Sequence, residues 1–113
     1  MSIRVTSDLW VSAHVRRCFS AGAMALVARR GATEAGAIFL KINRLYGRFD
    51  LYGPAPQTDF DEDRPRDRLF ERVLEECPES EIDERLTREA RFDSDLWIVE
   101  IEDREGRAFL DGL

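Results

Sequence analysis

The residues most able to do chemistry in this 113-residue chain are its single histidine and its two cysteines. Trp10, His14 and Cys18 follow one another at intervals of four, so on a helix all three lie along one edge. A histidine beside a thiol can activate it, but nucleophilic catalysis also needs an exposed thiol and a third group that orients the base. The apolar neighbours of His14 and Cys18 favour packing in a core instead, and we assign no catalytic residue.

Metal and phosphate sites lack their usual patterns. Two cysteines and one histidine cannot supply the four ligands of a structural zinc site, and no glycine-rich phosphate loop precedes a helix. Asp59, Asp61, Glu62 and Asp63 begin like a calcium loop, but Arg64-Pro65 stands where the glycine turn belongs. The sequence therefore predicts no metal and no cofactor. Cys18 and Cys77 are far apart, and we expect reduced, buried thiols.

Arginine is the residue type whose placement most suggests recognition. The net charge of −6 is the sum of +5 over residues 1–56 and −11 over residues 57–113, from eight basic and three acidic groups and then nine basic and twenty acidic. A basic first half can receive an anion or an acidic partner, although charged faces are also ordinary solvated surface. The candidate anion- or partner-binding residues are Trp10, Arg16, Arg17, Arg29, Arg30, Arg44, Arg48 and Tyr52.

The elements that must position these arginines centre on residues 36–56. Two apolar runs flank the turn Asn43–Gly47, which is typical of a β-hairpin. One face of this hairpin, with Ile38, Leu40 and Ile42, is expected to be buried and the other partly exposed. A strand over 23–30 precedes the hairpin, and short links between the three strands favour an antiparallel meander.

Helices and a last strand complete the predicted order α-β-β-β-α-α-β. Periodic apolar residues predict a helix over 8–21 that ends at Gly22, a helix over 69–77, and a short helix from Ser80 to Ala90. Residues 96–102 are expected to join the sheet, and 107–110 could return as a final strand. The fold class is therefore α+β, an antiparallel sheet of four or five strands with helices packed on one face, in one domain with a mobile acidic loop near 57–66.

Four motifs are distinctive in combination. They are Ser7-Asp8-Leu9-Trp10-Val11, Arg29-Arg30-Gly31 with Glu34-Ala35-Gly36-Ala37-Ile38, Asp50-Leu51-Tyr52-Gly53-Pro54-Ala55-Pro56-Gln57, and Glu89-Ala90-Arg91-Phe92-Asp93 before Asp95-Leu96-Trp97. Together they resemble a family of short proteobacterial proteins that is known as a domain of unknown function. The likeness spans nearly the whole chain and implies a small stand-alone cytoplasmic protein without assigned catalytic residues.

Three functions remain open at this point. The leading hypothesis is a non-enzymatic interaction module, in one form a homodimer, that uses a basic sheet or hairpin surface to bind an acidic protein partner. The alternative is a small-molecule site or an enzyme site for an anionic metabolite near Tyr52–Pro56, where a rigid Gly-Pro loop meets Trp10 and Arg17. Nucleic-acid binding is a weaker alternative, because the pI near 4.8 opposes it. No run of about 18 apolar residues predicts a membrane span, so we expect a cytoplasmic protein.

Overall fold

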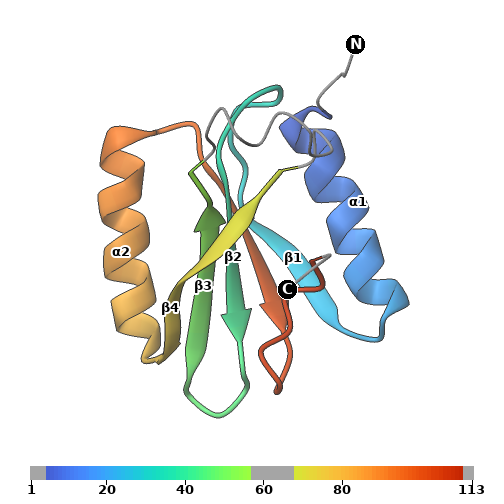
Figure 1. Ribbon diagram of the computed structural model, residues 1–113, viewed down its shortest axis with the longest axis vertical. Helices are drawn as coiled ribbons and strands as arrows, with labels where there is room; N and C mark the ends of the chain where they lie inside the picture. The colour runs from blue at the N-terminus through green and yellow to red at the C-terminus, as the bar shows by residue number, and fades with distance from the viewer. Residues whose placement is uncertain (1–4, 57–67, 111–113) are drawn as a thin grey trace.

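The computed structural model describes residues 5–56 and 68–110, which form two helices and one five-stranded sheet (Figure 1). This α+β arrangement with five strands confirms the predicted fold class. The elements in chain order are α1 (Ser7–Ser20), β1 (Met24–Arg29), β2 (Ile38–Asn43), β3 (Phe49–Pro54), β4 (Phe70–Cys77), α2 (Glu79–Phe92) and β5 (Trp97–Glu102).

The order of strands in space differs from the predicted meander. The sheet runs β1-β5-β2-β3-β4, and β5 lies parallel to β2 while the other neighbours are antiparallel. The sheet is therefore mixed, and β1 does not pair with β2. Apolar side chains on both faces of β5 explain its central place, because Trp97 and Val99 pack in one core and Ile98 in the other.

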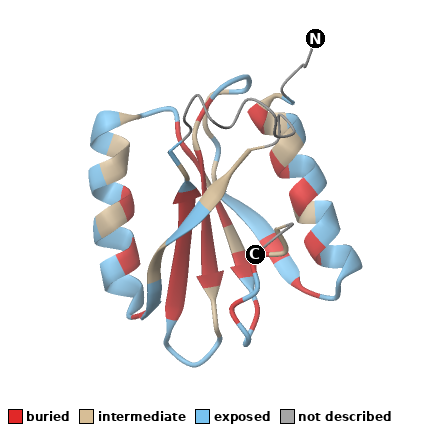
Figure 2. Cartoon of the chain, in the orientation of Figure 1, coloured by how far each residue is buried: buried red, intermediate tan, exposed pale blue. Residues whose placement is uncertain are grey.

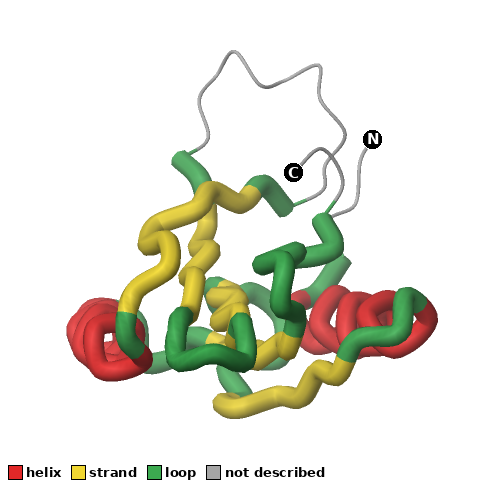
Figure 3. Tube along the Cα trace, turned by 90° about the horizontal axis from the view of Figure 1, so that it is seen from below, coloured by secondary structure: helices red, strands yellow, loops and turns green. Residues whose placement is uncertain are grey.

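The two helices cover opposite faces of the sheet, which corrects the expectation that they share one. Leu40 of β2 packs in the cluster that contains Val11 of α1, whereas its neighbour Phe39 packs with Ile82 of α2. Successive side chains of a strand point to opposite faces, so the helices must too. Figure 3 shows α1 and α2 at either side of the strands. The face of the hairpin expected to be partly exposed is therefore buried as well (Figure 2).

Residues 70–77 form a strand, so the helix predicted over 69–77 is wrong. The strand β4 pairs antiparallel with β3, and the register shifts twice, between Phe49 and Leu51 and between Leu51 and Tyr52. Each shift adds a residue on the β4 side, as β-bulges do. Two extra residues turn an alternating pattern into apolar side chains three or four apart, which is the spacing of a helix.

Other predicted elements are confirmed. The helix over 8–21, the strand over 23–30, the hairpin, the helix from Ser80 and the strand over 96–102 correspond to α1, β1, β2–β3, α2 and β5. Residues 107–110 form no strand. Neither described helix is long and apolar enough to cross a membrane. The acidic loop near 57–66 lies outside the described residues.

The loop between β1 and β2 packs tightly against the start of β5. The amide of Ala32 donates to the carbonyl oxygen of Asp95 at 2.9 Å, and the indole of Trp97 donates to the carbonyl of Ala32 at 2.8 Å. A Cβ added at Gly36 would overlap the carbonyl oxygen of Asp95, so this position accepts only glycine without movement. These contacts hold residues 31–37 against the start of β5, and backbone hydrogen bonds from Ser7 and Asp8 hold the same loop beside the N-terminus of α1.

Candidate functional site

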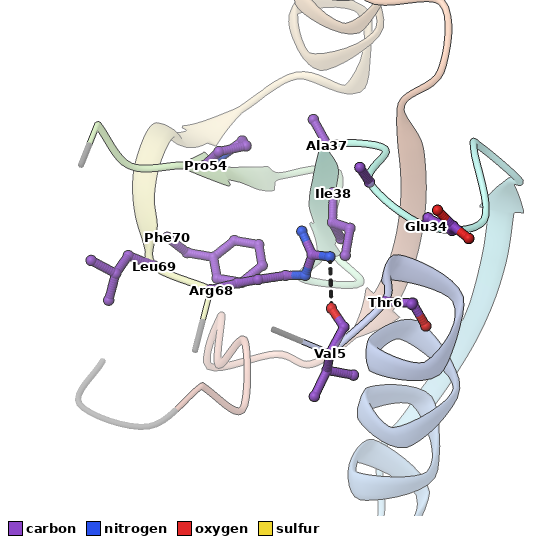
Figure 4. A pocket seen from close by; sticks show the side chains of 10 residues that line it. Val5, Thr6, Glu34, Ala37, Ile38, Pro54, Arg68, Leu69 and Phe70 are labelled. Atoms are coloured by element: carbon purple, nitrogen blue, oxygen red, sulfur yellow. Dashed lines mark hydrogen bonds between the residues drawn. The ribbon is translucent and has the colours of Figure 1, made fainter. Parts of the chain in front are cut away.

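One cavity of about 500 Å³ lies where α1 begins and where β3 ends, and we call it the Arg68 cavity. Its walls come from the start of α1, the loop before β2, the end of β3 and the residues that lead into β4 (Figure 4). Most of the lining is apolar, with Arg68, Glu34 and Thr6 as the polar members. The lining residues are Val5, Thr6, Glu34, Ala35, Ala37, Ile38, Pro54, Arg68, Leu69 and Phe70.

Ser7, the first residue of α1, connects three of these walls. Its side chain is fully buried, and Oγ donates to the carbonyl oxygen of Gly36 at 2.7 Å. The same oxygen accepts a hydrogen bond of 2.9 Å from Nη2 of Arg68. A single hydroxyl thus connects α1, the loop before β2 and the chain that enters β4.

The N-terminus of α1 is already satisfied and is not an anion site. The amides of Ser7 and Asp8 donate to the carbonyl oxygens of Glu34 and Thr33, at 3.1 and 3.0 Å. Thr6 Oγ1 donates to the carboxylate of Asp8 at 2.7 Å, and the same carboxylate oxygen accepts from the amide of Leu9. These amides of α1 already donate hydrogen bonds, so they are not available to bind an anion in the cavity.

Arg68 brings a positive charge to the cavity wall. Besides its bond to Ser7, Nη2 donates to the carbonyl oxygen of Val5 at 3.1 Å, and Figure 4 shows the guanidinium reaching from the β4 side toward Val5. The side chain is half-buried, so water screens its charge less than on an open surface. Glu34 also lines the cavity but is exposed.

Aromatic rings support the cavity from behind. The ring of Phe70 lies 5.1 Å from the ring of Trp10, and Trp10 stacks on His14 with centroids 4.5 Å apart. His14 is buried, and its Nε2 donates to the carbonyl oxygen of Ala108 at 2.8 Å. This row of three rings holds Phe70 in a fixed position. Trp10, named from the sequence as a candidate, therefore lies one side chain behind the cavity.

The candidate arginines divide between three regions. Arg16 and Arg17 are exposed on α1. Arg29, which donates to the carbonyl of Ser94 at 2.9 Å, and Arg30, which lies 5.0 Å from the ring centre of Trp97, are at the end of β1. Through Ile98 of β5, Arg29 is level with Phe39 at the start of β2. Arg44 and Arg48 lie in the turn after Asn43, where β2 ends, so the two groups are at opposite ends of the sheet.

The arginines of the hairpin turn differ from each other in role. Nη2 of Arg44 lies 2.7 Å from the carboxylate of Asp50, which is fully buried, whereas Arg48 is exposed. Tyr52 is buried in the sheet, with Arg72 over its ring at 6.0 Å. The structure therefore does not gather the candidate residues around one concavity. That they bind an anion or a partner stays a prediction.

The other buried polar groups have structural contacts. Burial raises the pKa of the Cys18 thiol to about 11, so the thiol is protonated at neutral pH. Lys41 donates to Glu79 at 2.7 Å and to Asp83 at 3.1 Å, which ties β2 to α2. Within the described residues no group of three histidine, cysteine, aspartate or glutamate side chains could hold a metal ion.

Sequence reasoning identified one wall of the cavity and missed the others. Pro54 lies in the stretch proposed for a small-molecule site, but Arg17 is not in the lining, and Arg68 supplies the positive charge instead. Glu34 and Phe70 were also missed. The sequence signal for Arg68 was weak, because it follows an acidic segment and precedes residues with helical spacing.

Comparison with known proteins agrees with the fold. A family model described as "Protein of unknown function (DUF1491)" matches residues 5–111. Comparison with curated proteins gives no match. A solution structure from Agrobacterium tumefaciens has 48% identity and a TM-score of 0.82, covering 96% of this chain and 93% of that one. A crystal structure of a DUF1491 family protein from Caulobacter crescentus has 37% identity and a TM-score of 0.76, with 95% and 93% covered. An NMR structure of a DUF1491 family protein from the same organism has 37% identity, a TM-score of 0.78, and 97% and 96% covered.

Proposed function

We propose a function for this chain from its own geometry, because the chain belongs to the DUF1491 family, and that family is described as one of unknown function. The proposed function is that of a non-enzymatic binding protein, which holds a small, mostly apolar molecule with one anionic group in the Arg68 cavity. The observation that carries the proposal is the cavity itself, an apolar hollow of about 500 Å³ with a guanidinium in its wall.

Size and lining define the ligand. Ligand pockets usually measure about 300–1,000 Å³ and are mostly apolar, with a few polar groups that fix orientation. The apolar lining, which includes Ile38, Pro54 and Phe70, favours a hydrocarbon or aromatic body. Arg68 favours a carboxylate or a similar acidic group, because guanidinium–carboxylate hydrogen bonds are charge-assisted. Glu34 is at the same cavity and disfavours a second negative charge.

The lining supports binding rather than catalysis. Among the described residues that line the cavity there is no histidine, cysteine or lysine. Glu34 and Thr6, which do line it, are not arranged as a base and nucleophile, because Glu34 is exposed and the Thr6 hydroxyl donates to Asp8. The buried His14, Lys41 and Cys18 are in the cores or hold elements together. The alternative of a small-molecule site near Tyr52–Pro56 is thus supported in its position, with Arg68 in place of Arg17.

The acidic-partner hypothesis receives less support from the geometry. Arg44 is paired with Asp50, and the exposed arginines lie on separate elements.

We retain two further proposals. The chain works in the cytoplasm, where its buried thiols would stay reduced, and it forms a homodimer, which the exposed edge of β1 supports.

Thermal unfolding with matched pairs of compounds tests the proposed ligand class. The acids are octanoate and 2-naphthoate, and their uncharged counterparts are octanol and 2-naphthylmethanol. We expect both acids to raise Tm with increasing concentration and the alcohols to raise it less, because only a ligand that binds the folded state stabilises it. No rise with any of the four compounds at about 5 mM would contradict the proposal.

A further inference from the structure

The strand β1 has an open edge. In the order β1-β5-β2-β3-β4 it pairs only with β5, so the backbone groups on its other side have no strand beside them within the described chain. Its sequence, Met-Ala-Leu-Val-Ala-Arg, contains no proline and no lysine, and its one charge comes at the end. Proteins usually block such edges with charges, proline, bulges or a covering segment. The register of β1 shifts between Val27 and Arg29, so the part of the edge that is suited to pairing is the segment before the shift, residues 24–27.

Large apolar side chains of β1 are exposed to solvent on both faces of the sheet. Met24, Leu26 and Val27 expose 60%, 56% and 38% of their surface. Met24 and Leu26 alternate with buried Ala25, which packs on the α1 side, so they point to the other face. The helix α2 on that face packs against β3 and β4 and leaves β1 uncovered. Figure 2 shows β1 as an exposed ribbon beside buried central strands.

Charges at the two ends of β1 favour a second copy as the occupant. Met24, at one end, is level with Glu102 of β5, which is exposed. Arg29 and Arg30 are at the other end. Antiparallel pairing of β1 with β1 of a second copy would bring the arginine end of each strand level with Met24 of its partner, and Glu102 lies one strand further on, about 10 Å away. The same pairing places the two copies of Leu26 close together near a two-fold axis, as a self-complementary interface requires.

We infer that β1 of one copy pairs antiparallel with β1 of a second copy, so that two five-stranded sheets join into one. The bonds between the two strands would satisfy the open backbone groups, and the exposed apolar side chains of both copies would be mutually covered. This inference rests on the homodimer proposed above and names its surface. That surface is distinct from the Arg68 cavity, so dimerisation and ligand binding can fail independently.

Sedimentation velocity of the full chain over concentrations from about 10 µM to about 1 mM tests this inference. We expect the wild type to pass from monomer to dimer. Leu26→Lys should weaken dimerisation at least about tenfold, because it places two like charges near the axis. Within one copy this lysine would face Glu100, its partner on β5, so the fold should tolerate it. Leu9→Lys, at an apolar position on α1 that is 61% exposed, is the matched control and should dimerise like the wild type.

Other results would overturn the inference. A wild type that stays monomeric at all concentrations excludes a second copy as the occupant. A dimer that Leu26→Lys leaves unchanged uses another surface. If Leu26→Lys does not fold, hydrogen exchange of the wild type decides: β1 amides must exchange more slowly at high protein concentration than at low, and equal rates would refute the pairing.

Discussion

The guanidinium of Arg44 lies 2.7 Å from the carboxylate of Asp50, and Asp50 is fully buried. The carboxylate also accepts a hydrogen bond of 2.7 Å from the backbone amide of Glu76, which has a positive φ of 45°. The pair therefore joins the hairpin turn to the end of β4. Arg44, which the sequence predicts as a binding residue, therefore also has a structural role in the fold.

Arg44→Ala is expected to destabilise the protein strongly. It leaves Asp50 buried without its cation, and breaking a buried ion pair in this way costs about 3–5 kcal/mol. Arg48→Ala, in the same turn but exposed, is the control and should change stability by less than about 0.5 kcal/mol. Urea unfolding at pH 7 measures both. Equal effects of the two variants would mean that the Arg44–Asp50 pair contributes nothing particular.

Lys41 should make stability fall at alkaline pH. Burial lowers the pKa of Lys41, but hydrogen bonds to Glu79 and Asp83 outweigh burial and raise the pKa above its ordinary value of 10.5. A raised pKa means that the folded state binds the proton more tightly, so this stabilisation is complete below the unfolded pKa and is lost as pH rises through the folded pKa. Lys41→Met lacks this contribution.

The measurement is the free energy of unfolding from pH 8 to pH 11.5 for the wild type and Lys41→Met. Tyrosines and cysteines titrate in both proteins, so the difference between the two curves isolates Lys41. We expect that difference to be constant at lower pH and to shift in favour of Lys41→Met above about pH 10.5, the ordinary pKa of lysine. Parallel curves over the whole range would show that Lys41 has no raised pKa.

Gly36→Ala should loosen the wall of the Arg68 cavity. The added methyl group would overlap the carbonyl oxygen of Asp95, which is backbone and cannot rotate away. Overpacking of this kind costs about 1–3 kcal/mol. The control Thr33→Ala changes an exposed side chain in the same loop. Thermal unfolding should show a clear loss of Tm for Gly36→Ala alone, and an unchanged Tm would refute the close contact.

The sequence predicts those elements whose pattern lies within one short segment, and it does not predict those that depend on contacts between distant segments. The hairpin could be predicted because Gly47, with a φ of 84°, closes a turn between two apolar runs. The strand β4 could not, because its bulges against β3 give Phe70, Val73, Leu74 and Cys77 the spacing of a helix. The insertion of β5 beside β2 depends on packing across the whole chain, which no local pattern records.

The candidate site was predicted only where one segment carries the signal. Pro54 and its rigid neighbours were recognised, because proline and glycine restrict the backbone locally. Arg68 was missed because its importance comes from Ser7 and Val5, which are about sixty residues away in sequence and adjacent only in the fold. A pocket assembled from four separate segments has no motif of its own.

Amide chemical shifts during a titration with 2-naphthoate locate the bound molecule and so decide whether the Arg68 cavity is a ligand site. We expect the largest shifts on residues 34–38 and 68–70. We also expect weaker binding for Arg68→Gln, by about tenfold for the loss of one charge-assisted contact, but unchanged binding for Arg72→Gln on the exposed side of β4. Shifts concentrated elsewhere, or equal binding by both variants, would contradict a ligand site at Arg68.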